Sequence, residues 1–363
     1  MEALASMAAN MGSGMKSSLV ILTPGFPSNE EDTNCLPYFQ TFVRAVNRNF
    51  PGVTVTVIST QYPYRKDEYD WFGNRVISLN TKGISRWQKP LTWWKVIQLV
   101  KNTRKQGNVT GVLCFWCLEE ALIGKLNSML NATPLLIWIC GQDAKAGNPW
   151  VKWIRPAPEE VVANSHFISE VFSHNYSIKP SCIVSNSIEP GNFPPMPDQR
   201  PIDLISVGSL IALKQTEVVL HMVKTLKDRG RQTRTVICGS GPEEFRLRRL
   251  AEALGVDPFV DFRGEASHEE TISLMQQAKI LVHPSSFEGY STVCLEALYA
   301  GCEVVSFVAA EAEPVERWHI VDTQAAMAAT CQQLLNNPSP HQRVLLHSAD
   351  DSARQMMALL GIT

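Results

Sequence analysis

The stretch from Ile280 to Val305 constrains the fold more than any other part of the sequence. It contains a short apolar run, a loop, a helical run that opens near Ser291, and a second apolar run that begins at Glu303. Short apolar strands on either side of a helix that ends in glycine are typical of a βαβ unit in a parallel sheet. The stretch therefore predicts an α/β protein with parallel strands.

Two carboxylates belong to this unit. Glu296 lies inside the apolar helical run, where an ionised side chain is costly unless it is hydrogen-bonded, and Glu288 precedes it by eight positions in the loop. Gly289, Tyr290 and Ser291 offer backbone N–H groups at the start of the helix, which favours the binding of a phosphate. We expect the carboxylates and an anion site to meet at one edge of the sheet. A buried glutamate paired with a nearby Arg or Lys is the simpler alternative.

The strand–loop–helix pattern occurs in both halves of the 363-residue chain, which predicts two doubly wound domains. The predicted divisions are a vector-derived tail at 1–14, an N-terminal domain at 15–186, a linker at 187–201, a C-terminal domain at 202–340, and a final helix at 341–363 that packs back on the N-terminal domain. The linker is placed by a segment, 186–201, with five prolines and one glycine.

Composition limits the binding partners and the cellular compartment that we expect for the protein. A net charge of −2 gives no indication of nucleic-acid binding, and no run reaches the roughly 20 apolar residues of a membrane span. Nine cysteines without a framework spacing favour a reducing cytoplasm. Cys114 and Cys117 form a C-x-x-C pattern inside an apolar strand-like run, so we interpret them as core cysteines rather than a redox pair.

The segment 82–105 is basic and rich in tryptophan. The sequence has no Asp or Glu between Trp71 and Leu118, but eight Lys or Arg. Tryptophans beside lysines on a helix are typical of a peripheral membrane contact, here at the inner face of the membrane. An ordinary amphipathic helix, with its tryptophans in the core and its lysines in water, is the alternative. A core stripe that includes Val96 and Val100 favours this second interpretation.

Four motifs of the C-terminal half resemble a known family. They are V-G-S-L-x4-K at 207–214, C-G-S-G-P-E at 238–243, F-R-G-E at 262–265 and the long run P-S-S-F-E-G-Y-S-T-V-C-L-E-A-L-Y-A-G at 284–301. Together they resemble retaining GT-B glycosyltransferases, nearest to the large family four, whose E-x7-E motif matches Glu288 and Glu296. The resemblance implies a GT-B architecture, with two Rossmann-like domains that face a cleft.

The resemblance also implies roles for residues. The donor is a nucleoside-diphosphate sugar, UDP- or GDP-linked, and the enzyme requires no metal and no further cofactor. Its diphosphate is expected against Gly208, Ser209 and the N–H groups of residues 289–291, and Gly25 after the first strand is also assigned to donor binding. Lys214 matches the cation that neutralises the β-phosphate, Glu296 the ribose ligand, and Glu288 the ligand of sugar hydroxyls.

Two positions depart from the family pattern. Ser209 stands where the family commonly has an arginine that forks onto the diphosphate, and serine cannot replace a bidentate cation. Arg263 is the candidate substitute. On the acceptor side Cys140 replaces the usual histidine, so only Asp143 is carried over as a catalytic candidate.

These residues predict transfer of a sugar from a nucleoside diphosphate, with retention, to a glycan, lipid-linked or small-molecule acceptor. Two other interpretations stay open: a nucleotide-sugar epimerase of the same fold, and a non-catalytic relative that acts as a binding partner. A Rossmann dehydrogenase is disfavoured, because neither half has G-x-G-x-x-G after its first strand.

Overall fold

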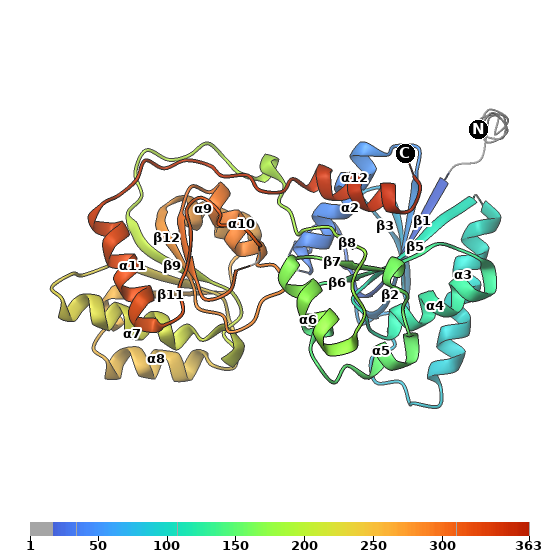
Figure 1. Cartoon of the computed structure of the whole chain (residues 1–363), viewed down its shortest axis with the longest axis horizontal. Coiled ribbons are helices and arrows are strands. Elements are labelled where there is room, and N and C mark those ends of the chain that lie inside the picture. Colours follow the sequence, from blue (N-terminus) through green and yellow to red (C-terminus); the bar gives the residue numbers. More distant parts are fainter. Residues whose placement is uncertain (1–16, 34, 107, 310, 363) are drawn as a thin grey trace.

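Two parallel sheets, one from each half of the chain, form the two lobes of the computed structural model (Figure 1). The structure describes residues 17–33, 35–106, 108–309 and 311–362, and the side chains of 104–110 are outside this description. The prediction of a vector-derived tail at 1–14 lies outside the described residues.

The N-terminal sheet has eight strands in the order β3-β4-β2-β1-β5-β6-β7-β8. Its strands are β1 (Ser17–Gly25), β2 (Thr54–Tyr62), β3 (Asp67–Trp71), β4 (Asn74–Ser78), β5 (Asn108–Phe115), β6 (Leu135–Ile139), β7 (Val161–Ala163) and β8 (Cys182–Ile183). Its helices are α2 (Pro37–Asn49), α3 (Lys89–Gln106), α4 (Glu119–Asn131), α5 (Pro149–Ile154) and α6 (His166–Tyr176). All strand pairs are parallel except β3–β4, an antiparallel hairpin at the edge.

The C-terminal sheet has six parallel strands in the order β11-β10-β9-β12-β13-β14. The strands are β9 (Ile202–Val207), β10 (Thr235–Cys238), β11 (Val260–Gly264), β12 (Ala278–His283), β13 (Glu303–Ser306) and β14 (Trp318–Ile320). The helices are α7 (Thr216–Asp228), α8 (Glu244–Ala253), α9 (His268–Gln276), α10 (Thr292–Tyr299) and α11 (Gln324–Asn336). In chain order this is 3-2-1-4-5-6, the Rossmann order. The predicted pair of doubly wound α/β domains is therefore confirmed.

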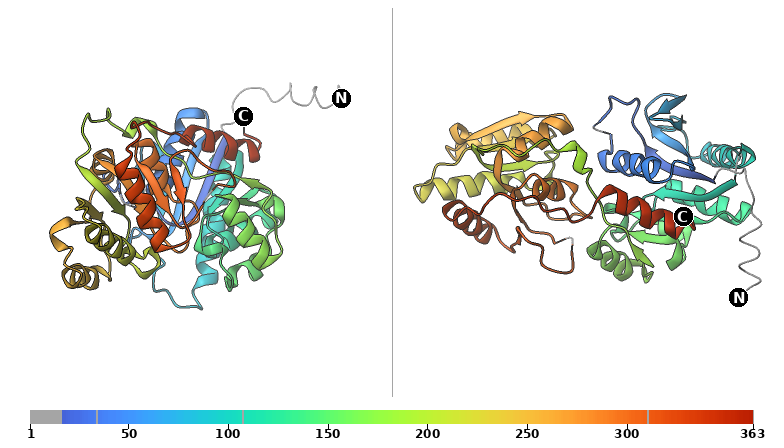
Figure 2. Two further views of the ribbon diagram at one scale, coloured as in Figure 1. Left: turned by 60° about the vertical axis from the view of Figure 1, so that its left-hand side comes forward. Right: turned by 90° about the horizontal axis from the view of Figure 1, so that it is seen from above.

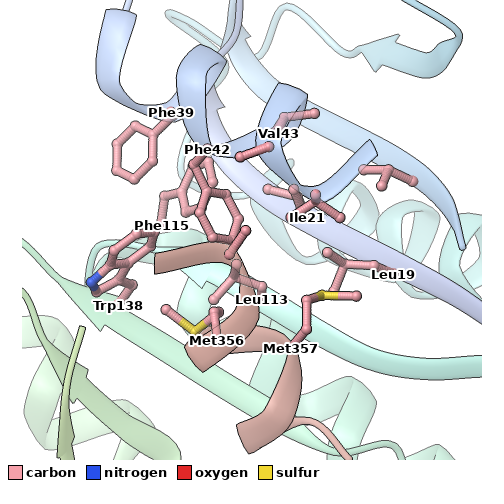
Figure 3. Packing of buried hydrophobic residues seen from close by; sticks show 14 of the residues in the cluster. Leu19, Ile21, Phe39, Phe42, Val43, Leu113, Phe115, Trp138, Met356 and Met357 are labelled. Carbon is pink, nitrogen blue, oxygen red and sulfur yellow. The ribbon is translucent and has the colours of Figure 1, made fainter. Parts of the chain in front are cut away.

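The last helix, α12 (Ala349–Leu359), lies on the N-terminal lobe, beside α2, as both views of Figure 2 show. Met356 and Met357 are fully buried there, against Phe42 of α2 and Leu113 of β5 (Figure 3). Together α2 and α12 cover one face of the N-terminal sheet, and α3, α4, α5 and α6 cover the other.

Several expected boundaries are corrected. The sequence predicts a helix from Gln342, but the helix begins at Ala349, because Ser348 caps it by accepting a hydrogen bond from the N–H of Asp351. The hairpin β3–β4 and the strand β14 were not predicted. Cys114 and Cys117 are fully buried, which confirms their interpretation as core cysteines.

The tryptophan-rich segment also differs from the favoured interpretation. Val96 and Val100 of α3 are buried as expected, but Trp87 is 91% exposed and Trp94 58% exposed. The tryptophans of this segment therefore do not all serve the core. Within the described residues, no helix combines the length and the apolar composition needed to cross a bilayer.

Candidate active site

The candidate site lies where the order of the C-terminal sheet reverses. β9 and β12 are neighbours at the centre of the sheet, and the connections that follow them run to opposite sides. In open α/β sheets a ligand binds in the crevice at the carboxyl ends of such strands. The loops after β9 and β12 line a pocket of about 510 Å³ here, and we call it the donor-side pocket. Tyr38, Phe39 and Trp116 of the N-terminal domain line its other side.

Glu288 forms an ion pair with Lys214 in this pocket. The ammonium of Lys214 donates to Oε1 of Glu288, and Nε2 of His283, at the end of β12, lies 3.0 Å from the same oxygen. Burial by itself raises the pKa of Glu288, but the His283 hydrogen bond and the Lys214 charge outweigh it and hold the pKa at about 2. Burial lowers the pKa of His283, whose side chain is 4% exposed. Glu288 is therefore an ionised acceptor of hydrogen bonds at neutral pH.

Glu296 is paired with a histidine rather than with the Arg or Lys of the simpler alternative. Its Oε1 lies 2.6 Å from Nε2 of His268, the first residue of α9. The hydrogen bond to Glu296 raises the pKa of His268, against the opposing effect of burial. Glu296 is 8% exposed and lines the donor-side pocket, as does His268. Among the described residues only Oε1 of Glu296 contacts a histidine, so the carboxylate retains capacity to accept a hydrogen bond from a ligand.

The loop between the two carboxylates is held against the N-terminal domain. A side chain at Gly289 is impossible without rearrangement, because its Cβ would lie 1.8 Å from the carbonyl oxygen of Cys140. The hydroxyl of Ser165 donates to the carbonyl of Gly289 at 2.7 Å, and Nδ2 of Asn186 donates to the carbonyl of Tyr290 at 3.0 Å. These contacts point the two carbonyls toward the N-terminal domain and fix the start of α10.

A second pocket, of about 770 Å³, extends from the same centre over the N-terminal domain. Lys214 and Glu288 line both pockets. We call this one the acceptor-side pocket, because the resemblance predicts the acceptor on the N-terminal domain. Asp143 lines it, but its carboxylate accepts the backbone N–H groups of Cys117, Cys140 and Gly141 at 2.9 to 3.2 Å. This geometry makes Asp143 a positioning residue that holds the ends of β5 and β6.

The structure brings together most of the predicted site residues. The donor-side pocket is lined by Gly208, Ser209, Lys214, Glu288, Tyr290, Ser291 and Glu296. Gly289 and Asp143 line the acceptor-side pocket. The side chain of Tyr290 is 4% exposed, and its hydroxyl donates to Glu311.

Two predicted residues are not brought to the site. Arg263 lies on the edge strand β11, where its Nε is 2.8 Å from Oδ2 of Asp261, and its side chain is 41% exposed. It lines neither pocket, so the structure does not bring this candidate substitute for the missing arginine to the donor-side pocket. Gly25 is also absent from both linings, because it packs against Tyr62 and Leu36, and only its neighbour Pro24 lines the acceptor-side pocket.

Sequence reasoning missed His268. The available signal was its place, four residues after the glycine that ends β11 and directly after Ser267, whose hydroxyl accepts from the N–H of Glu270 and caps α9. A polar side chain at the first position of such a helix lies at the carboxyl edge of the sheet, where ligands bind. Its partner, however, is 28 positions away in the sequence.

Part of the chain is similar in sequence to known glycosyltransferases. Residues 193–345 match the family model "Glycosyl transferases group 1". The chain is 24% identical over 164 residues to the phosphatidylinositol N-acetylglucosaminyltransferase gpi3 subunit of Schizosaccharomyces pombe, and 38% identical over 107 residues to the D-inositol 3-phosphate glycosyltransferase of Corynebacterium jeikeium. These alignments cover 44% and 28% of this chain, and only 36% and 26% of the two relatives.

Solved structures match over nearly the whole chain. The sucrose-phosphate synthase of Thermosynechococcus elongatus has a TM-score of 0.67 at 16% identity, over 96% of this chain and 95% of that one. HepE of Anabaena, in complex with UDP and glucose, has a TM-score of 0.70 at 13% identity, over 96% of this chain and 100% of that one. These similarities show that the chain has the GT-B fold.

Proposed function

With a C-terminal domain of the glycosyl transferases group 1 family on a GT-B fold, we propose that the protein transfers a sugar from a nucleoside-diphosphate sugar to an acceptor, with retention of configuration. The observation that carries the proposal is the convergence of Glu288, Lys214 and Glu296 in one pocket at the reversal of the sheet. A cation, hydrogen-bond acceptors and a helix start are the groups that a sugar diphosphate requires.

Each group has a proposed role. Lys214 donates one N–H to Glu288 and has two more to donate, so it is free to neutralise the β-phosphate as the sugar departs. The N–H groups of Tyr290 and Ser291 at the start of α10 support the same phosphate. Glu296 binds the ribose hydroxyls with the oxygen that His268 leaves available, and the ionised Glu288 accepts hydrogen bonds from the sugar.

The proposed reaction takes place on one face of the sugar. The bond from the anomeric carbon to the β-phosphate oxygen breaks, the acceptor oxygen bonds to the same carbon, and the leaving phosphate takes the acceptor's proton. Glu288 is held by Lys214 and His283, so we assign it to sugar binding and not to the role of a carboxylate nucleophile. No metal or further cofactor is invoked. Closure of the cleft around the donor limits hydrolysis by water.

A nucleotide-binding assay tests the donor site. We expect one of UDP, GDP, ADP and dTDP to raise the thermal midpoint most, since binding stabilises the folded state by mass action. HepE of Anabaena and the pneumococcal GtfA have been solved with UDP, which favours a UDP-linked donor over the GDP-linked alternative. Glu296→Gln should abolish the rise, whereas Glu270→Gln, at an exposed position on α9, should leave it unchanged.

Turnover distinguishes the two alternatives to a transferase. A transferase consumes its donor faster when an acceptor is present. An epimerase interconverts donor sugars without any acceptor, and a non-catalytic relative does neither. Failure of every nucleotide to shift the wild type would contradict the proposed donor site and would favour the non-catalytic interpretation.

The exposed tryptophan-rich segment supports a peripheral membrane contact, which we also propose. Leu91 and Trp94 of α3 are 73% and 58% exposed, beside basic residues that anionic lipids attract. The protein should therefore sediment with anionic vesicles at low salt. Replacing Arg86, Lys89 and Lys95 by glutamine should abolish sedimentation, and a wild type that stays in the supernatant would contradict the proposal.

A further inference from the structure

The acceptor-side pocket continues into a third hollow, which we call the tryptophan groove. It has a volume of about 730 Å³, and it shares Pro149 and Trp150 with the acceptor-side pocket. Its lining consists of Arg86, Trp87, Lys89, Pro90, Trp93, Pro149, Trp150 and Trp153. Pro149 and Trp150 therefore lie between the pocket that contains Lys214 and Glu288 and an aromatic surface on the N-terminal domain.

The groove is built on fixed side chains. Nε1 of Trp93 donates to Oε1 of Glu119 at 2.7 Å, and Lys89 forms an ion pair with the other oxygen of that carboxylate. On the opposite wall Asn148 caps α5, and its Nδ2 donates to the carbonyl of Asp143 at 2.9 Å. Asp143, which holds the strand ends beside the acceptor-side pocket, therefore also positions the helix that carries Trp150 and Trp153.

The lining favours a hydrocarbon over a sugar. Of the eight described residues that line the groove, four are tryptophans, two are prolines and two are cations, with no carboxylate or amide among them. Sugar hydroxyls are bound by carboxylate and amide side chains in addition to aromatic rings, and the described lining contains neither. An apolar wall with a cationic rim is complementary to an alkyl or prenyl chain joined to an anion.

A cation lies between the groove and the reacting centre. Lys145 lines the acceptor-side pocket, and its Nζ lies 4.1 Å from the ring centroid of Phe287, the neighbour of Glu288. In the described part of the chain Lys145 forms no salt bridge. Its ammonium is therefore available for a phosphate, which lysine binds as a point charge.

We propose that the acceptor is lipid-linked, with its hydrocarbon chain in the tryptophan groove, its phosphate at Lys145 and its reacting hydroxyl beside Glu288. The assignment rests on the proposed transferase function, because it takes the acceptor-side pocket as the acceptor site. It explains why the aromatic groove opens onto this pocket rather than onto the donor-side pocket.

Calorimetric titration with dodecyl phosphate, below its micellar concentration, tests the groove. We expect binding to the wild type, and a loss of about tenfold or more in affinity for Trp87→Ala/Trp153→Ala. Both tryptophans are largely exposed, at 91% and 59%, so the variant should fold. Trp94→Ala is the matched control, because Trp94 of α3 is 58% exposed but does not line the groove.

Two further ligands identify what the groove recognises. Lys145→Met should lower the affinity for dodecyl phosphate but leave the affinity for uncharged dodecyl maltoside unchanged. Maltotetraose should show no binding that depends on Trp87 and Trp153. If maltotetraose binds there and dodecyl phosphate does not, the groove is a glycan subsite and the proposal is wrong. If dodecyl phosphate binds the wild type and the double variant equally, the chain does not enter the groove.

The result is separable from the donor site. Nucleotide-induced stabilisation depends on Glu296, and dodecyl phosphate binding depends on Trp87, Trp153 and Lys145. If the wild type is stabilised by a nucleotide but does not bind dodecyl phosphate, only the lipid assignment is overturned. Dodecyl phosphate binding without any nucleotide binding would support the groove and overturn the transferase.

Discussion

Removal of the Lys214 charge should destabilise the protein in a pH-dependent way. The pKa of Glu288 is lowered from its usual 4.5 to about 2. At 1.36 kcal/mol per pH unit, this corresponds to a net favourable interaction of about 3 kcal/mol for the ionised carboxylate. Because the pKa is depressed, this stability is present above pH 4.5 and is lost as the pH falls toward 2. Lys214→Met keeps the length of the side chain but removes the charge that opposes the cost of burial.

We therefore expect Lys214→Met to lower the free energy of unfolding by about 3 kcal/mol at pH 7, since it removes the cation paired with a largely buried carboxylate and leaves that carboxylate with its His283 contact. In the variant the Lys214 charge no longer lowers the pKa of Glu288, so the loss should persist at pH 4.5 and shrink as the pH is lowered to about 2.5, where the carboxyl is largely protonated in the folded variant. Adding Glu288→Gln to the variant should recover more than half of the loss at pH 7. Urea unfolding at these pH values measures all three effects.

Lys279→Met is the matched control. Lys279 pairs with Asp203 at 2.7 Å near the start of β12, and its side chain is 36% exposed, so water screens the pair. We expect a loss below about 1 kcal/mol at each pH value. The reasoning is refuted if Lys214→Met unfolds like the wild type at pH 7, or if its loss is the same at about pH 2.5 and is not relieved by Glu288→Gln.

Three further predictions concern the donor site and α12. Ser209→Arg should tighten nucleoside diphosphate binding by about tenfold in a titration, because a charge-assisted fork adds to Lys214, and unchanged affinity would show that Ser209 does not face the diphosphate. Glu296 raises the pKa of His268, so the stability from this pair is complete below the ordinary pKa of about 6.5 and is lost as the pH rises through the folded pKa. His268→Gln should flatten this part of the pH–stability curve, and an unaltered curve would count against the pair. Met357→Ala should cost about 2–5 kcal/mol by the urea assay, whereas Leu359→Ala, 39% exposed on the same helix, should change stability by less than about 0.5 kcal/mol. Equal losses in the two variants would contradict the packing of α12 on α2.

The local pattern of the sequence determined the regular elements and part of the site. β10 (Thr235–Cys238) consists of four apolar or β-branched residues between polar segments, a local pattern that favours a buried strand. Ser165, a residue type that favours helix starts, caps α6 with its hydroxyl accepting from the N–H of Ile168. The positions of Glu288 and Glu296, on either side of a helix start, followed from spacing within one βαβ unit. All of these depend on neighbours a few residues apart.

Elements that depend on distant partners were decided by the tertiary structure. β3 (Asp67–Trp71) carries three carboxylates and lacks an apolar strand pattern, yet it pairs because β4 presents a free edge. α12 packs on α2 because that face of the N-terminal sheet is otherwise uncovered, a fact that no local pattern contains.

The same distinction applies to the site. Arg263 follows a recognisable motif, but its strand lies at the edge of the sheet and its side chain pairs with Asp261, away from the pocket. The pairing of His268 with Glu296, and the meeting of Trp93 with Trp150 in one groove, join residues that are many positions apart. The sequence alone determined which chemical groups each loop carries. The packing of helices and strands within each domain decided which of these groups face one another, because contacts between distant residues depend on the whole fold.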